Sequence, residues 1–197
     1  RGLSAEAVVP PGCDPPGDFE LRTMGSPPRL AFLGRVVRTK RPGDALKAFK
    51  LVRERYPDAG FDVIGTGYLK QELETLSHPG VTFHGFVPGE EKDRILRSVD
   101  ILLVPGTREG WGIVAIEAAI RGIPVVAYDI AGLRDAVVNG ETGIVVKSDP
   151  AAMATAALEL LGDAVRWRAM SERAMARGRG FSWEAAAAGV LEAASAG

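Results

Sequence analysis

Residues Ile101–Ala127 read ILLVPGTREGWGIVAIEAAIRGIPVVA, and this stretch decides the fold. Two short apolar runs, Ile101–Val104 and Val125–Ala127, flank a segment of about residues 112–121 whose apolar residues recur at helical spacing. Apolar runs without alternation are typical of strands that are covered on both faces. A helix that joins two such strands predicts a right-handed βαβ unit and therefore a parallel sheet.

The same alternation of strands and helices extends along most of the chain. Four further runs are predicted to be strands: Leu30–Leu33, Phe61–Ile64, Val81–Phe83 and Ile144–Val146. Helices are predicted at about residues 43–55, 67–76, 89–98, 132–138, 150–161, 163–178 and 183–195. We expect an α/β protein with a Rossmann-like, doubly wound parallel sheet of about six strands, in the order 3-2-1-4-5-6, and extra C-terminal helices. Phe181 and Trp183 are expected to anchor these last helices.

The ends of the chain differ in composition from this central part. Residues 1–28 are rich in proline and glycine and predict a lead-in or linker, in which Leu3–Val9 could form an edge strand. Residues 29–180 are predicted to form one domain, and residues 181–197 a C-terminal helix. The chain begins without methionine, so we expect that an upstream part precedes it.

The composition excludes several classes of protein. The 24 Lys and Arg residues and 25 Asp and Glu residues of the 197-residue chain nearly cancel, which leaves no basic field for nucleic acid or an anionic membrane. The single cysteine, Cys13, rules out an internal disulfide framework and a multi-cysteine zinc site. No apolar stretch is long enough to span a bilayer, and the first residues lack the apolar core of a signal peptide. We expect a cytoplasmic protein.

In the expected sheet, ligands bind where the strand order reverses, beyond the carboxyl ends of the first and fourth strands. The loop after the first strand carries four basic residues within seven positions and no acidic one: Arg35, Arg38, Lys40 and Arg41. Arginine forks and a compact lysine charge suit phosphate oxygens. A solvated basic loop is the alternative.

The loop after the fourth strand, Pro105–Gly112, leads into a helix without the usual Ser, Thr, Asp or Asn cap. Uncapped backbone N–H groups at a helix start form an anion site, and Gly112 would let a phosphate approach closely. Glu117 follows among apolar residues of that helix. Because an unpartnered buried carboxylate is costly, we expect it to meet a donor such as a ribose hydroxyl, unless it reaches solvent.

Two further loops give weaker signals. Gly65-Thr66-Gly67 follows the second strand and is typical of a phosphate loop or of an ordinary tight turn. His84 precedes Gly85 and Phe86 after the third strand and is as consistent with a satisfied loop histidine as with a functional one. Two histidines and one cysteine form no credible catalytic triad or metal cluster.

Taken together in order, these segments resemble the retaining glycosyltransferases of family 4. The resemblance rests on the spacing of Glu109 and Glu117 and on Gly34-Arg35-x4-Lys40. Further matching segments are Gly65–Gly67, Gly85–Val87, Ala118 with Gly122–Ala127, Gly132–Asp135 and Asn139–Gly143. It covers about residue 8 to the end, and implies the C-terminal nucleotide-sugar-binding half of the GT-B fold, which has two Rossmann-like domains. Family members usually have two glycines where this chain has Ala131-Gly132, which leaves sugar selectivity open.

The resemblance also implies residue roles. Arg35 and Lys40 would bind the donor diphosphate, and Glu109 would face the transferred sugar or its phosphate; these three are the implied catalytic residues. Glu117 would hold the ribose hydroxyls. The full set of implied donor-binding residues is Gly34, Gly65, Gly67, Phe86, Val87, Gly110, Gly112, Ile113, Val114 and Glu117. Retention could proceed by double displacement through Glu109 or by same-face substitution, and the sequence does not decide between them.

The resemblance implies a donor substrate, a nucleotide-diphosphate sugar, and no cofactor. No Asp-x-Asp triplet is present, so we expect metal-independent binding in which cations replace magnesium. An N-terminal acceptor domain would be missing from this chain, and through it the enzyme could lie at the inner face of the membrane. Two alternatives are a stand-alone nucleotide-sugar-binding subunit with a partner acceptor subunit, and half of a GT-B-fold epimerase. The isolated chain is expected to transfer little or no sugar.

Overall fold

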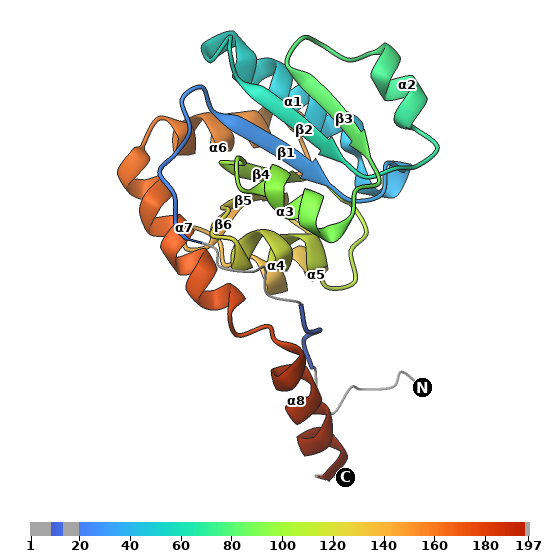
Figure 1. Cartoon of the computed structure of the whole chain (residues 1–197), viewed down its shortest axis with the longest axis vertical. Helices are drawn as coiled ribbons and strands as arrows, with labels where there is room; N and C mark the ends of the chain where they lie inside the picture. Colours follow the sequence, from blue (N-terminus) through green and yellow to red (C-terminus); the bar gives the residue numbers. More distant parts are fainter. Residues whose placement is uncertain (1–8, 14–19, 196–197) are drawn as a thin grey trace.

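A computed structural model describes residues 9–13 and 20–195, and its strands form a six-stranded parallel sheet in the order β3-β2-β1-β4-β5-β6 (Figure 1). The strands are β1 (Arg29–Leu33), β2 (Gly60–Ile64), β3 (Val81–Gly85), β4 (Ile101–Val104), β5 (Val125–Tyr128) and β6 (Gly143–Val146). The predicted fold class and strand order are confirmed. In the register, Ala31 of β1 pairs with Asp62 of β2 on one side and with Leu102 of β4 on the other.

The helices follow the strands as expected. They are the 3-10 helix η1 (Arg38–Lys40) and the α-helices α1 (Pro42–Arg55), α2 (Lys70–Thr75), α3 (Gly89–Leu96), α4 (Ile113–Ile120), α5 (Ala131–Ala136), α6 (Pro150–Leu161), α7 (Ala164–Gly178) and α8 (Trp183–Ser195). Proline opens α1 and α6, where its missing N–H is not needed. The helix predicted at about 67–76 begins later, at Lys70, because the preceding residues form a turn in which the Lys70 N–H bonds to the Gly67 carbonyl and the Leu69 N–H bonds to the Val36 carbonyl.

Two apolar layers hold the sheet between its helices. One lies between the sheet and helices α1 and α6; there Phe49 of α1 stacks on Phe61 of β2 with ring centroids 4.9 Å apart. The other lies between the sheet and helices α3, α4 and α5, and includes Leu102 of β4 and Ile116 of α4. All residues of β4 and β5 are buried, as their unbroken apolar sequence indicates.

The last two helices differ in how they pack. Helix α7 contacts α4 and α6, and contributes Trp167 to the core. No residue of α8 is buried, and the helix extends away from the sheet (Figure 1). Phe181, just before α8, packs against the α4 side as expected, whereas Trp183 is 57% exposed. Trp183 nevertheless lies against Gly12, where a Cβ atom would come within 2.6 Å of the Trp183 ring, so it contacts the lead-in and not the sheet.

The lead-in contains no helix or strand in its described parts, residues 9–13 and 20–28. Its second part is tied to the sheet by Asp100, whose carboxylate accepts from the Gly25 N–H at 2.8 Å and from Arg22 at 2.7 Å. The edge strand predicted at Leu3–Val9 falls almost wholly outside the described residues. Among the described helices, none combines the length and the apolarity needed to cross a membrane.

Candidate functional site

The candidate site lies where the strand order reverses, between the neighbouring strands β1 and β4. The loops that follow β1, β2, β3 and β4 all leave the same edge of the sheet, because parallel strands share their carboxyl ends. Gly34 bonds to the end of β2, with its N–H 2.9 Å from the Ile64 carbonyl, and the Gly65 N–H lies 2.8 Å from the Gly85 carbonyl. Hydrogen bonds therefore connect the loops that carry the predicted residues Gly34 and Gly65 to each other and to the loop after β3.

The basic turn after β1 contacts the loop after β4. The Thr107 N–H donates to the Thr39 carbonyl at 2.9 Å, and the Lys40 ammonium lies 2.5 Å from a Glu109 carboxylate oxygen. The Lys40 and Glu109 side chains are 21% and 8% exposed, so the pair is largely shielded from water. Two of the three implied catalytic residues are thus brought into direct contact.

A cavity of about 300 Å³ lies among the loops that follow β1, β2 and β3. Its lining includes five of the predicted site residues, Gly34, Arg35, Gly65, Phe86 and Val87. Gly65 has φ +135, and a Cβ atom on it would collide with the Gly34 carbonyl oxygen, so the close approach of the two loops requires glycine. Phe86 is 82% exposed and leaves one wall of the cavity apolar and open. Gly67 lies outside this lining, against the Val36 carbonyl.

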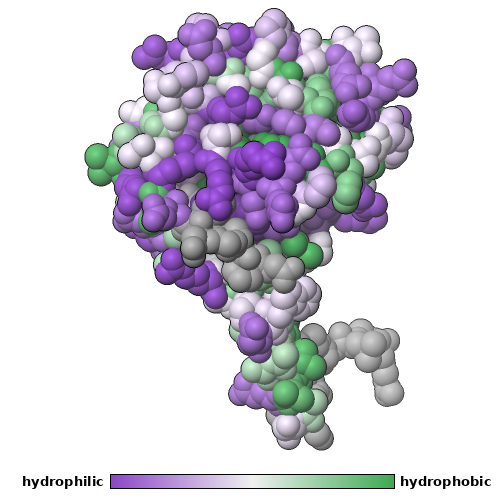
Figure 2. Space-filling view, in the orientation of Figure 1, coloured by the Kyte–Doolittle hydropathy of each residue, from purple (hydrophilic) through white to green (hydrophobic). Residues whose placement is uncertain are grey.

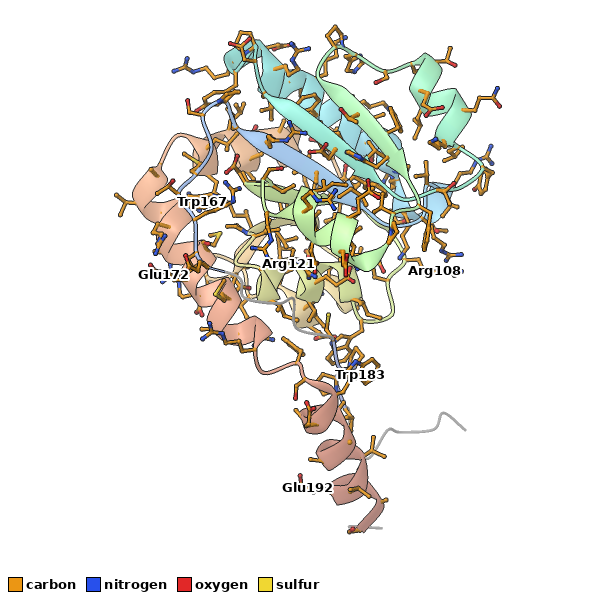
Figure 3. The ribbon with its side chains drawn as sticks, viewed as in Figure 1. Arg108, Arg121, Trp167, Glu172, Trp183 and Glu192 are labelled. Carbon is orange, nitrogen blue, oxygen red and sulfur yellow. The ribbon has the colours of Figure 1, made fainter. Side chains whose placement is uncertain are left out.

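Helix α4 begins as predicted, without a capping side chain. Gly112 is its N-cap with φ 68 and ψ 41, and no side chain of the described residues hydrogen-bonds to this helix start. Ile113 is 51% exposed, Val114 packs on the core, and Gly110 has open space around its Cα. Arg108, from the same loop, lies at the surface (Figure 3). The helix start can therefore offer backbone donors to an anion.

Glu117 meets a cation rather than solvent. Its carboxylate lies 2.6 Å from the ammonium of Lys92, which comes from α3, and the two side chains are 19% and 25% exposed. Its position is fixed further by Arg121, which donates to the Glu117 carbonyl and pairs with Asp93. The expectation that Glu117 needs a hydrogen-bond donor is met by Lys92, which sequence reasoning missed.

Lys92 lies between two cavities. It lines the cavity of Arg35 and Phe86, and also a second one of about 320 Å³ that Ile113 and Glu117 line. The helical pattern of residues 89–98 indicated α3, but nothing in the sequence showed which of its charges faces α4. The pairing of Lys92 with Glu117 follows from the packing of α3 beside α4.

The site therefore combines lysines, an arginine, open backbone donors and two carboxylates, each of which is paired with a lysine. Such a set can bind a diphosphate through charge-assisted hydrogen bonds. His84 is accounted for structurally, because its Nε2 lies 2.8 Å from the buried Asp62. Among the described residues, no group of three or more His, Cys, Asp or Glu side chains is placed to hold a metal ion.

The comparisons with known proteins agree with this geometry. Residues 27–163 match the family described as Glycosyl transferases group 1. The chain is 37% identical to the D-inositol 3-phosphate glycosyltransferase of Nocardia farcinica over 96% of this chain and 47% of that protein. The chain spans about half the length of the curated relatives that it matches.

Solved structures share the fold. The C-terminal domain of the group 1 glycosyl transferase LpcC from Francisella tularensis superposes with a TM-score of 0.67 at 22% identity, over 76% of this chain and 83% of that one. HepE from Anabaena, in complex with UDP and glucose, superposes with a TM-score of 0.73 at 19% identity, over 85% of this chain and 48% of that one. The chain belongs to the group 1 glycosyl transferases and has the fold of the C-terminal half of a GT-B enzyme.

Proposed function

We propose that this chain is the donor-binding half of a retaining glycosyltransferase of family 4, which transfers a sugar from a nucleotide-diphosphate sugar to an acceptor. One observation carries the proposal: Lys40 and Glu109, from the loops that follow β1 and β4, meet at 2.5 Å at the strand reversal. UDP and glucose in the HepE complex are a precedent for this ligand class on the same fold.

The proposed roles follow the chemistry of each group. Arg35 and Lys40 bind the diphosphate, and the backbone N–H groups of Gly112, Ile113 and Val114 add aligned donors. An ammonium has three hydrogens, so Lys40 can keep its bond to Glu109 and still donate to a phosphate oxygen. In this proposal Glu109 faces the transferred sugar or its phosphate.

The nucleoside occupies the cavity between the loops. Gly34 and Gly65 have no side chain to obstruct the base and ribose, Gly67 lets its loop pass close to Val36, and Phe86 and Val87 supply apolar contact. Glu117 accepts from the ribose hydroxyls and is held in place by Lys92. Gly110 leaves room at the loop for the sugar.

In the transfer step, the bond from the anomeric carbon to the diphosphate oxygen breaks, a bond to the acceptor hydroxyl oxygen forms, and the hydroxyl proton passes to the departing diphosphate. Negative charge grows on the departing diphosphate while the sugar takes on oxocarbenium character. Fixed positive charge and aligned N–H groups stabilise that charge without reorganisation. We propose that Arg35, Lys40 and the α4 start supply this stabilisation without a metal ion and without a cofactor, and that the anomeric configuration is retained.

The acceptor site belongs to the rest of the protein in this proposal. Residues 29–180 form the donor domain, residues 1–28 link it to an N-terminal acceptor domain, and residues 181–197 form a helix that returns toward that domain. The whole enzyme works in the cytoplasm, and the isolated chain binds donor but transfers little or no sugar.

A nucleotide panel tests the proposal. We expect thermal-shift and calorimetric measurements with UDP, GDP, ADP and their sugars to show that one nucleotide series binds, because a ligand of the native state raises its melting temperature. Its affinity should be the same with EDTA as without. Binding of none of these nucleotides would contradict the donor role, and a large loss of affinity on chelation would contradict metal independence.

A further inference from the structure

Arg41 has a backbone conformation that residues other than glycine rarely adopt. Its φ of 49 and ψ of 47 are left-handed, and among residues 9–13 and 20–195 it is the only non-glycine residue with positive φ. It ends η1 and directly precedes Pro42, the first residue of α1. A left-handed residue with a Cβ atom is strained, so other contacts must hold it there.

Two buried side chains provide these contacts. The Arg41 Nε lies 2.9 Å from Asp44 Oδ2, and the Tyr128 hydroxyl donates to the same oxygen at 3.0 Å. The Arg41 guanidinium also lies over the Tyr128 ring, with Cζ 5.6 Å from its centroid. Asp44 is 8% exposed and Tyr128 is completely buried, so water does not compete strongly with the bond between them, whereas the Arg41 side chain is 37% exposed.

Tyr128 is the last residue of β5 and lies 84 positions from Asp44 in sequence. Burial, and then the hydrogen bond to Asp44, raises the pKa of the Tyr128 phenol. The phenol therefore stays protonated at neutral pH and remains a donor to Asp44. In this way the end of β5 is tied to the first turn of α1 and to Arg41.

Lys40 directly precedes Arg41 in the same turn. The Lys40 N–H bonds to the Val37 carbonyl at 3.0 Å, and Thr39 accepts from Thr107, so the turn is closed on both sides. A lysine side chain has many rotamers, and its ammonium is positioned only when the backbone that carries it is fixed. A change of Arg41 to an ordinary helical or extended conformation would redirect the chain at Lys40.

We propose that Tyr128 and Asp44 are positioning residues that hold Arg41 in its left-handed conformation and thereby hold Lys40 against Glu109. This inference deepens the proposed function, because it rests on Lys40 as the group that binds the diphosphate. Tyr128 and Asp44 act through the turn and need not touch the donor. The competing explanation is that they stabilise the fold and have no particular effect on Lys40.

Amide hydrogen exchange of the ligand-free chain separates these explanations. The measured quantity is the ratio of the exchange rate of the Thr107 amide, which bonds to the turn, to that of the Leu102 amide of β4, which reports the stability of the sheet. In Tyr128→Phe we expect this ratio to rise about fivefold over its value in the unmodified chain. Asp44→Asn, which keeps the shape of the side chain, should act in the same direction. Tyr56→Phe, at the opposite end of α1, is the matched control and should leave the ratio unchanged. An equal change at Thr107 and Leu102 would show a purely structural role and overturn the proposal.

Binding by two variants of Arg41 tests the backbone argument. Alanine is strained in the left-handed region and glycine is not, while both remove the guanidinium. We expect Arg41→Ala to weaken UDP binding about fivefold, Arg41→Gly to keep it within about twofold of wild type, and uridine binding to be unchanged in both. Equal losses in both variants would show that Arg41 acts through its charge, and would overturn the proposal.

The two experiments also separate this proposal from the proposed function. If the unmodified chain binds none of UDP, GDP and ADP, the donor role fails. The exchange measurement needs no nucleotide and still decides whether the Arg41, Asp44 and Tyr128 contacts fix the turn.

Discussion

At the scale of single residues, the candidate site is built on two lysine–carboxylate pairs. Lys40 pairs with Glu109 at 2.5 Å, and Lys92 pairs with Glu117 at 2.6 Å. Each pair is partly buried, so removing one partner leaves a charge that water solvates poorly. The pattern in the sequence pointed to both glutamates and to Lys40. It did not point to Lys92, because a charged residue on a short helix has no periodicity that distinguishes a partner from a solvated side chain.

The substitution Lys40→Ala should weaken binding of the diphosphate without changing binding of the nucleoside. We expect UDP to bind about ten- to a hundredfold more weakly, as for loss of a charge-assisted hydrogen bond, and uridine to bind as in the unmodified chain. Lys50→Ala, on the exposed face of α1, is the control and should change neither affinity. Calorimetry with both ligands is the measurement. Equal losses for UDP and uridine would remove Lys40 from the diphosphate site.

The substitution Lys92→Met, unlike Lys40→Ala, should weaken the binding of the nucleoside as well as of the nucleotide. Because Lys92 holds the proposed ribose ligand Glu117, uridine and UDP should both bind about tenfold more weakly. Lys147→Met breaks an exposed ion pair with Asp149 and is the matched control. A loss for UDP alone would show that Lys92 acts on the phosphates instead of on the ribose.

At the scale of elements, the buried strands were the most predictable. Strands β4 and β5 were predicted to within one residue, because unbroken apolar runs between turn residues have few other interpretations. The short elements were not: η1 was missed, and α2 starts later than predicted. Their residues are determined by bonds between loops, such as Leu69 N–H to the Val36 carbonyl, and a single segment of sequence carries no signal for such bonds.

The start of α4 permits a sharp test of one glycine. Gly112 has φ +68, and a Cβ atom there would lie 2.9 Å from Leu133 Cδ2 and 3.1 Å from the Gly132 carbonyl oxygen. Gly112→Ala should therefore lower the free energy of unfolding by about 1–3 kcal/mol. Urea denaturation measures this change.

Gly110→Ala is the matched control for stability, since nothing lies within 4 Å of its Cβ position. We expect it to change the free energy of unfolding by about 0.5 kcal/mol or less. Similar costs at the two glycines would mean that the left-handed cap of α4 contributes nothing specific.

At the scale of the whole molecule, strand order is what assembles the site. Because β1 lies between β2 and β4, the loops that follow β1, β2, β3 and β4 all meet at one edge of the sheet. That convergence could be predicted, because it follows from topology alone. The contact of Tyr128 with Asp44 could not, since it depends on which side chains of two packed layers happen to meet.

Two of the three tryptophans of the chain lie in contrasting positions (Figure 3). Trp167 of α7 is 2% exposed, and its indole N–H donates to the Asp100 carbonyl at 2.8 Å, so α7 belongs to the core. Trp183 begins α8, which shows a mixture of apolar and polar residues on its visible surface (Figure 2). Val190 and Leu191 of the same helix are 57% and 68% exposed. Helix α8 therefore adds little apolar burial to this chain.

This contrast predicts how the two tryptophans affect stability. Trp167→Ala should lower the free energy of unfolding by about 3–5 kcal/mol, because it empties a core site and leaves the Asp100 carbonyl without its donor. Trp183→Ala should lower it by about 1 kcal/mol or less, as for a surface change. Urea denaturation of the two variants side by side is the measurement. A cost at Trp183 as large as that at Trp167 would mean that α8 folds as part of the sheet domain. Its apolar side chains would then not be available to the proposed acceptor domain.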